Sequence, residues 1–362
     1  MRSPAGTFAA VLVIGLGSGH PRPALGAQQP PAARPATGWT VARDPFVDLW
    51  FHSLAVVGYE GYGPLGLYDA RYAERVRDAK TQAHLTTTLD RRAADFRRLF
   101  AADSAFEVLH FLPLYFVGRE PSLVLSALRT AVRETPRNAP ASSLTSAANV
   151  IAAALPTQQE RATLASLLDA VDDEWNTFLR ADRSSRVADD RRAVRDLQST
   201  WDDRFARSLD GYLGAMGITR GTILISPAVG AEGRIVRDPN GMAIVVVAPG
   251  RAVAGDNTVL LRVVRELAFP LLDQLRTPLV APTTRVAAER ARDAAAVRAG
   301  AIILDSVDKS LAAEYRRLFL DAIGGRAFDA AYPISNETEV ELRRLVTSAA
   351  RGAASGRTSY EN

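Results

Sequence analysis

Apolar residues recur every three or four positions along most of the chain, which is the spacing of amphipathic helices. The pattern begins near Pro45 and predicts helices over 47–57, 72–85, 91–100, 122–133, 143–155, 158–180 and 186–213. Near Gly217 it changes to short β-branched segments, which predict strands at 222–226, 233–237 and 242–248. A turn is expected at 238–241, and helices resume at 258–275, 285–304, 306–323 and 337–350.

This order of elements predicts a predominantly helical α+β protein. A helical N-terminal part precedes a small, mostly antiparallel β-sheet, and a helix bundle follows it. The unbroken apolar run 244–247 indicates a strand that is covered on both faces. We therefore expect a helical subdomain at 45–216, an α+β subdomain at 217–350 and a disordered tail at 351–362.

The N-terminus has the pattern of an export signal. Arg2 supplies the positive charge, residues 8–16 form a short apolar run, and small residues at 24–27 offer a cleavage site. We therefore predict a signal peptide at 1–27, a Pro/Ala-rich linker at 28–44 and export to the periplasm or exterior of a bacterium. No later stretch is long and apolar enough to predict a transmembrane segment.

Composition excludes several classes of site. The 362 residues contain no cysteine, so disulfides, thiolate metal sites and a cysteine nucleophile are ruled out, and four histidines leave little for a histidine metal centre. We expect His52, His84 and His110 to be buried, hydrogen-bonded residues. The net charge of +4 does not indicate nucleic-acid binding, because the arginines alternate with acidic residues.

The helix after the last predicted strand carries the most informative motif. Residues 265–269 read Arg-Glu-Leu-Ala-Phe, and Glu289 follows on the next predicted helix. This segment resembles the zinc-binding helix of gluzincin-type metallopeptidases, whose H-E-x-x-H pattern holds Zn²⁺ and activates a water molecule. The resemblance covers about residues 218–325 and implies a zincin-like fold for the C-terminal part.

On this resemblance Glu266 is a vestige of the catalytic glutamate. Arg265, Phe269 and Glu289 stand at former metal-ligand positions. Arginine repels a metal ion and phenylalanine has no lone pair, so we expect no zinc and no other cofactor. Arg265 is expected to pair with Glu266 or Glu289 in place of the metal, and Pro270 to end or bend the helix.

The preferred interpretation is a non-catalytic binding or scaffold protein with an unidentified protein or peptide partner. One alternative is an active hydrolase, either metal-dependent or serine-based through Ser306 and Lys309, which match the S-x-x-K motif. Another is a helical interaction module without enzymatic ancestry. A further alternative needs no functional site: Glu266 would simply lie on the polar, solvent-facing side of its helix.

Overall fold

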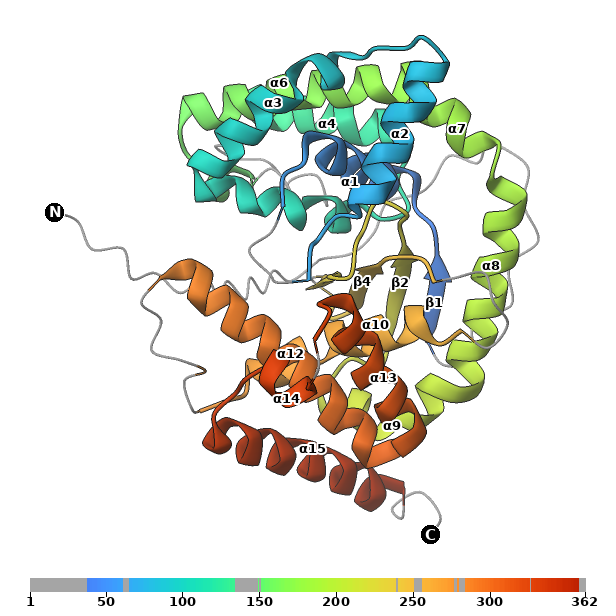
Figure 1. The fold of residues 1–362 in the computed structure, drawn as a ribbon, viewed down its shortest axis with the longest axis vertical. Helices are drawn as coiled ribbons and strands as arrows, with labels where there is room; N and C mark the ends of the chain where they lie inside the picture. Colours follow the sequence, from blue (N-terminus) through green and yellow to red (C-terminus); the bar gives the residue numbers. More distant parts are fainter. Residues whose placement is uncertain are drawn as a thin grey trace, which may run out of the picture.

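The structure is a computed structural model. It describes residues 38–60, 65–133, 149, 151–238, 240–250, 256–276, 279, 284–325 and 327–357. The predicted signal peptide and most of the predicted linker lie outside the described residues. Within them, the protein is predominantly helical, with a small sheet between two helical layers (Figure 1).

The sheet has four strands in the order β1-β2-β4-β3. Their bounds are β1 Trp39–Ala42, β2 Gly221–Ile225, β3 Arg234–Arg237 and β4 Ala243–Val247. β1, β2 and β4 are parallel, and only the β3–β4 pair is antiparallel. The prediction of a mostly antiparallel sheet is therefore wrong, because β4 also pairs with β2, and β1 comes from a segment that was assigned to the linker.

Alternate side chains of the central strands enter two different hydrophobic cores. Leu224, Ile244 and Val246 pack into the core of the first helical layer. Ile223 and Val245 point the other way and pack into the core of the second layer. All five residues of β4 are buried, so the predicted cover on both faces is confirmed.

The first helical layer covers one face of the sheet (Figure 1). Its helices are α1 Pro45–Val57, α2 Ala70–Gln82, α3 Thr88–Ala102, α4 Pro121–Arg133 and α6 Gln158–Glu174. Two 3₁₀ segments, Ser104–His110 and Leu112–Phe116, lie between α3 and α4. Asp44 caps α1 by accepting from the backbone N–H groups of Phe46 and Val47 at 2.9 Å.

A helical connection then runs beside the sheet to the second layer (Figure 1). It comprises a π-helical segment Trp175–Leu179, α7 Arg180–Ser184, α8 Val187–Thr200, a second π-helical segment Trp201–Phe205 and α9 Ala206–Ala215. Gln198 of α8 accepts from the N–H of Val41 at 2.6 Å and donates to the carbonyl of Trp39 at 3.1 Å. These bonds occupy backbone groups on the outer edge of β1.

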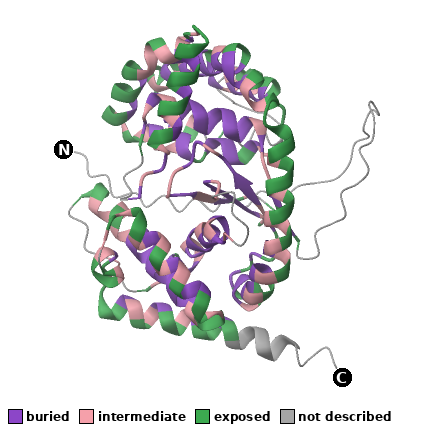
Figure 2. Cartoon of the chain, turned by 45° about the vertical axis from the view of Figure 1, so that its right-hand side comes forward, coloured by how far each residue is buried: buried purple, intermediate pink, exposed green. Residues whose placement is uncertain are grey.

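The second layer covers the other face of the sheet. It contains α10 Thr258–Leu267, α11 Phe269–Leu272, α12 Arg285–Val307, α13 Lys309–Ala322, α14 Phe328–Ala331 and α15 Asn336–Arg357. α10 ends just before Pro270, as predicted, since proline cannot donate to the Glu266 carbonyl. Figure 2 shows the sheet and the inner faces of both layers buried, with the exposed residues outside. α15 extends to Arg357, into the segment predicted as a tail.

Each described helix is too short or too polar to cross a membrane.

Candidate functional site

Arg265 and Glu266, on the last turn of α10, are buried and form an ion pair. Arg265 has no exposed surface and Glu266 is 1 % exposed. Arg265 Nη1 donates to Glu266 Oε1, and its Nη2 donates to Asp293 Oδ1 of α12 at 2.8 Å. Glu266 also accepts from the backbone N–H of Gly233, just before β3, at 3.1 Å. The two carboxylates keep the pKa of Arg265 above its ordinary value against the effect of burial.

The predicted pair between Arg265 and Glu266 is therefore present. The partner on α12 is Asp293 instead of Glu289, which lies one helical turn earlier on the same face. Sequence reasoning overlooked Asp293, although its spacing of four residues from Glu289 is the signal that could have revealed it. The surface explanation of Glu266 does not hold, because the carboxylate lies in the interior.

The ring of Phe269, at the start of α11, lies close to two cations. The guanidinium carbon of Arg265 lies 5.2 Å from the ring centroid, and that of Arg292 lies 5.6 Å from it. At these distances both cations interact with the ring. Phe269 therefore contributes a cation-binding face where the resemblance would place a metal ligand.

Glu266, Phe269 and Glu289 line one cleft of about 310 Å³. Arg265 lies beneath it and is wholly covered. The remaining lining residues come from the 3₁₀ segment before Leu112, from the β3 strand with its preceding loop, and from α11 and α12: Glu107, His110, Phe111, Glu232, Gly233, Arg234, Ile235, Val236, Arg237, Pro270, Asp273, Arg292 and Asp293. The structure thus brings the four predicted site residues together and adds Glu232, Arg234 and His110, which the sequence did not indicate.

Burial changes the proton affinity of the acids in this cleft. It raises the pKa of Asp293 to about 7, an effect that Arg265 opposes and the nearby carboxylates of Glu232 and Glu266 reinforce. Burial also raises the pKa of Glu266, against the influence of Arg265 and Arg234. The cleft therefore holds a carboxyl group that can gain or lose a proton near neutral pH.

The residues at the positions where the resemblance would place zinc ligands do not fit a zinc ion. Arg265 brings a permanent positive charge, Phe269 offers no donor atom, and Glu266 is already bound by Arg265 and Gly233. In the part of the chain that the structure describes, no three His, Asp or Glu side chains are grouped so that they could hold a metal.

Ser306 and Lys309 lie away from this cleft. Both are exposed, at the end of α12 and the start of α13. Ser306 Oγ donates to the carbonyl of Ile303 at 2.6 Å, within its own helix. Such a bond is usual for a serine in a helix and provides no general base for it.

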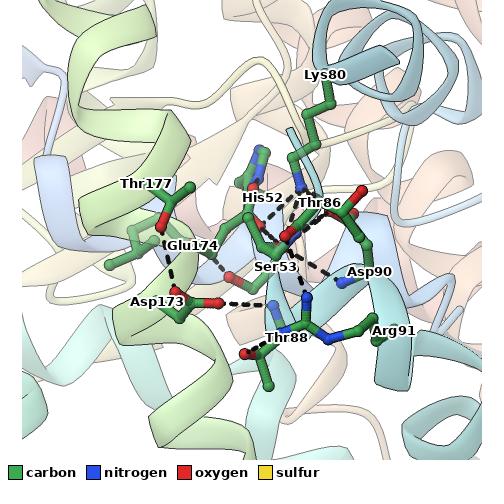
Figure 3. Close-up of polar contacts among 12 residues, drawn as sticks. His52, Ser53, Lys80, Thr86, Thr88, Asp90, Arg91, Asp173, Glu174 and Thr177 are labelled. Atoms are coloured by element: carbon green, nitrogen blue, oxygen red, sulfur yellow. Dashed lines mark hydrogen bonds and ion pairs between the residues drawn. The ribbon is translucent and has the colours of Figure 1, made fainter. Parts of the chain in front are cut away.

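A second group of buried charges lies in the first helical layer (Figure 3). Glu174 accepts from Lys80 at 2.7 Å and from Thr87 at 2.6 Å, and its other oxygen lies 2.7 Å from His52 Nε2. Lys80 also donates to Asp90 at 2.8 Å. These contacts hold the pKa of Glu174 to about 2 despite its burial, mainly through the bond to His52. The group connects α1, α2, α3 and α6.

The prediction for the histidines holds in two of three cases. His52 is buried between Glu174 and Tyr72, and His110 is buried with Nδ1 2.9 Å from the Tyr68 hydroxyl. His84 is exposed, just after α2, and its φ of 54° places it in the left-handed region. It terminates the helix in the conformation that follows many helix ends.

The chain was compared with protein-family models, with curated proteins and with solved structures, and nothing matches.

Proposed function

We propose that this chain is an exported, non-catalytic peptide-binding protein that resembles a gluzincin-type metallopeptidase lacking its zinc site. The observation that carries the proposal is the position of Arg265, buried between Glu266 and Asp293 beneath the cleft. A guanidinium in this place supplies the positive charge that two buried carboxylates need, and it leaves Glu266 engaged instead of free to activate water.

The edge strand β3 supports a peptide as the occupant. β3 ends the strand order of the sheet, and all four of its residues line the cleft. An edge strand can accept an extended peptide through main-chain hydrogen bonds, while neighbouring pockets select the side chains. The cleft therefore combines a surface for backbone pairing with a row of polar side chains.

Two measurements on the purified protein test the proposal. Metal analysis is expected to find no stoichiometric zinc, and addition of zinc is expected to produce no hydrolysis of a fluorogenic peptide library. Labelled peptides of eight residues with blocked ends are expected to bind, and the substitution Ile235→Pro, which removes an outward-facing backbone donor from the free edge of β3, to weaken them. Stoichiometric zinc with peptide hydrolysis would overturn the proposal, and so would the absence of any peptide binding.

A further inference from the structure

Three polar residues of the cleft take no part in the contacts around Arg265. They are His110, Glu232 and Arg234, and the first two are each 2 % exposed. His110 Nε2, Glu232 Oε2 and Arg234 Nε are buried, and none has a hydrogen-bond partner among the described residues. Leaving such atoms unpaired costs free energy, so their presence in the wall of one cleft indicates a ligand that pairs with them.

The three residues are neighbours and are held rigidly. Glu232 Oε1 accepts from Arg234 Nη1, and the guanidinium carbon of Arg234 lies 5.4 Å from the ring centroid of Phe111, the residue after His110. His110 stacks on the ring of Tyr59, with 4.6 Å between centroids. The unpaired atoms are therefore preorganised and do not need to be collected when a ligand arrives.

Their chemistry restricts the ligand. Glu232 Oε2 can only accept from the ligand, and Arg234 Nε can only donate to it. Burial and the charge of Arg234 lower the pKa of His110 well below its ordinary value, so the imidazole is neutral. A carboxylate or phosphate would leave Glu232 without a donor and be repelled by it. An ammonium group would leave Arg234 without an acceptor.

A primary carboxamide meets both requirements in one planar, neutral group. Its NH₂ donates to Glu232 Oε2, and its carbonyl oxygen accepts from Arg234 Nε or from His110 Nε2. Because the site lies beside β3, we propose that it receives the side chain of a glutamine or asparagine in an extended peptide bound along that strand. This inference rests on the proposed peptide-binding function and adds the identity of one recognised residue.

Peptide mixtures with one fixed position test the inference. Fluorescein-labelled octapeptides with blocked ends would carry glutamine, asparagine, glutamate or methionine at a central position and random residues elsewhere. Fluorescence anisotropy is expected to give a Kd about ten- to a hundredfold lower for the glutamine or asparagine mixture than for methionine or glutamate. Methionine matches glutamine in length and lacks its donors and acceptor.

Variants show whether the named residues cause the preference. Glu232→Gln replaces the acceptor by an amide, and His110→Phe keeps a ring on Tyr59 without Nε2. Each is expected to reduce the preference for glutamine over methionine at least fivefold, while Glu74→Gln, at an exposed position on α2, leaves it unchanged. Thermal unfolding confirms that each variant is folded, and having two variants keeps the test valid if one is not.

The outcomes separate the inference from the function on which it rests. If all mixtures bind equally, or if both variants keep the preference, the carboxamide site is refuted and peptide binding stands. If no mixture binds, peptide binding itself is refuted. If the protein binds a chito-oligosaccharide and no peptide, the same atoms pair with sugar hydroxyls, and both the carboxamide site and the peptide-binding function are refuted.

Discussion

Replacing Arg265 by methionine removes a buried cation and keeps most of its volume. The substitution leaves Glu266 and Asp293 without their shared partner, and both carboxylates are largely excluded from solvent. Breaking a buried ion pair from one side costs about 3–5 kcal/mol, because the remaining charge is uncompensated. We expect the free energy of unfolding to fall by about this amount at pH 8.

The loss is expected to depend on pH. Without Arg265 the two acids can be accommodated only by protonation, so their pKa values rise further and acidification neutralises them. Urea unfolding should therefore show a loss at pH 5.5 that is smaller than the loss at pH 8 by about 1 kcal/mol or more. The midpoint shift and the slope of each transition are the quantities to record.

Arg298→Met is the matched control. Arg298 is also largely buried and pairs with two acids, Asp329 and Glu339, but the side chain of Asp329 is 81 % exposed. Water screens these partners, so the expected loss is about 1 kcal/mol with little change between the two pH values. A loss for Arg265→Met no larger than that of the control, or one that does not vary with pH, would refute the account of the buried cluster.

Three further variants test other parts of the structure by urea unfolding. In the folded state the pKa of Asp293 is about 7, above its ordinary 3.8. The free energy of unfolding of the wild type should therefore fall as pH rises from about 4 through 7, and Asp293→Asn should make this fall smaller. Lys80→Met should lower the free energy of unfolding by about 3–5 kcal/mol at pH 7, because it leaves the buried Glu174 carboxylate without this partner. In the wild type, the stabilisation from Glu174, whose pKa is about 2, should disappear as pH falls from 4.5 towards 2. Gln198→Ala removes two hydrogen bonds to β1 and should cost about 1–2 kcal/mol at any pH. The Asp293 prediction is contradicted if Asp293→Asn makes the pH dependence steeper, and the Glu174 prediction if the wild type keeps its stability in acid. The Gln198 prediction is contradicted if Gln198→Ala leaves the unfolding transition unchanged.

The local elements were predictable because their signals are local. The apolar run 244–247 marks β4, and the turn signal before it appears as a bond from the Gly241 N–H to the Asp238 carbonyl at 2.9 Å. An acidic residue precedes the helix after β4, and Asp256 accepts from the N–H of Thr258, the first residue of α10, at 2.9 Å.

The order of the strands and their parallel pairing were not predictable from such local signals. Three consecutive strands with a tight turn between the last two suggest a meander, yet β2 pairs with β4, and β3 lies outside. β1 has only four residues and follows a Pro/Ala-rich stretch, so its composition gave no warning that it would pair with a strand far along the chain. Pairing at such separation is decided by packing between the helical layers.

The candidate site likewise contains some residues that the sequence could group and others that only the fold brings together. Glu266 and Phe269 could be grouped because they lie three residues apart in a predicted helix, and Glu289 because the resemblance to the metallopeptidases implies a ligand position on the next helix. His110 and Glu232 could not, since the first ends a 3₁₀ segment of the first layer and the second belongs to the loop before β3. Only the fold brings these two elements to one cleft, and no local pattern relates them.

Charge balance explains how the fold accommodates a cleft that is lined by several buried acids. Glu232, Glu266 and Asp293 would form a buried acidic group that strongly disfavours the folded state if it lacked a counter-charge. Arg234 and Arg265 each bind at least one of these acids directly, and the guanidinium of Arg265 bridges α10 and α12. Because arginine keeps its charge across the physiological pH range, these counter-charges remain in place when Asp293, whose pKa burial raises to about 7, loses its proton. The same ion pairs thus fix the positions of the charged side chains that line the cleft.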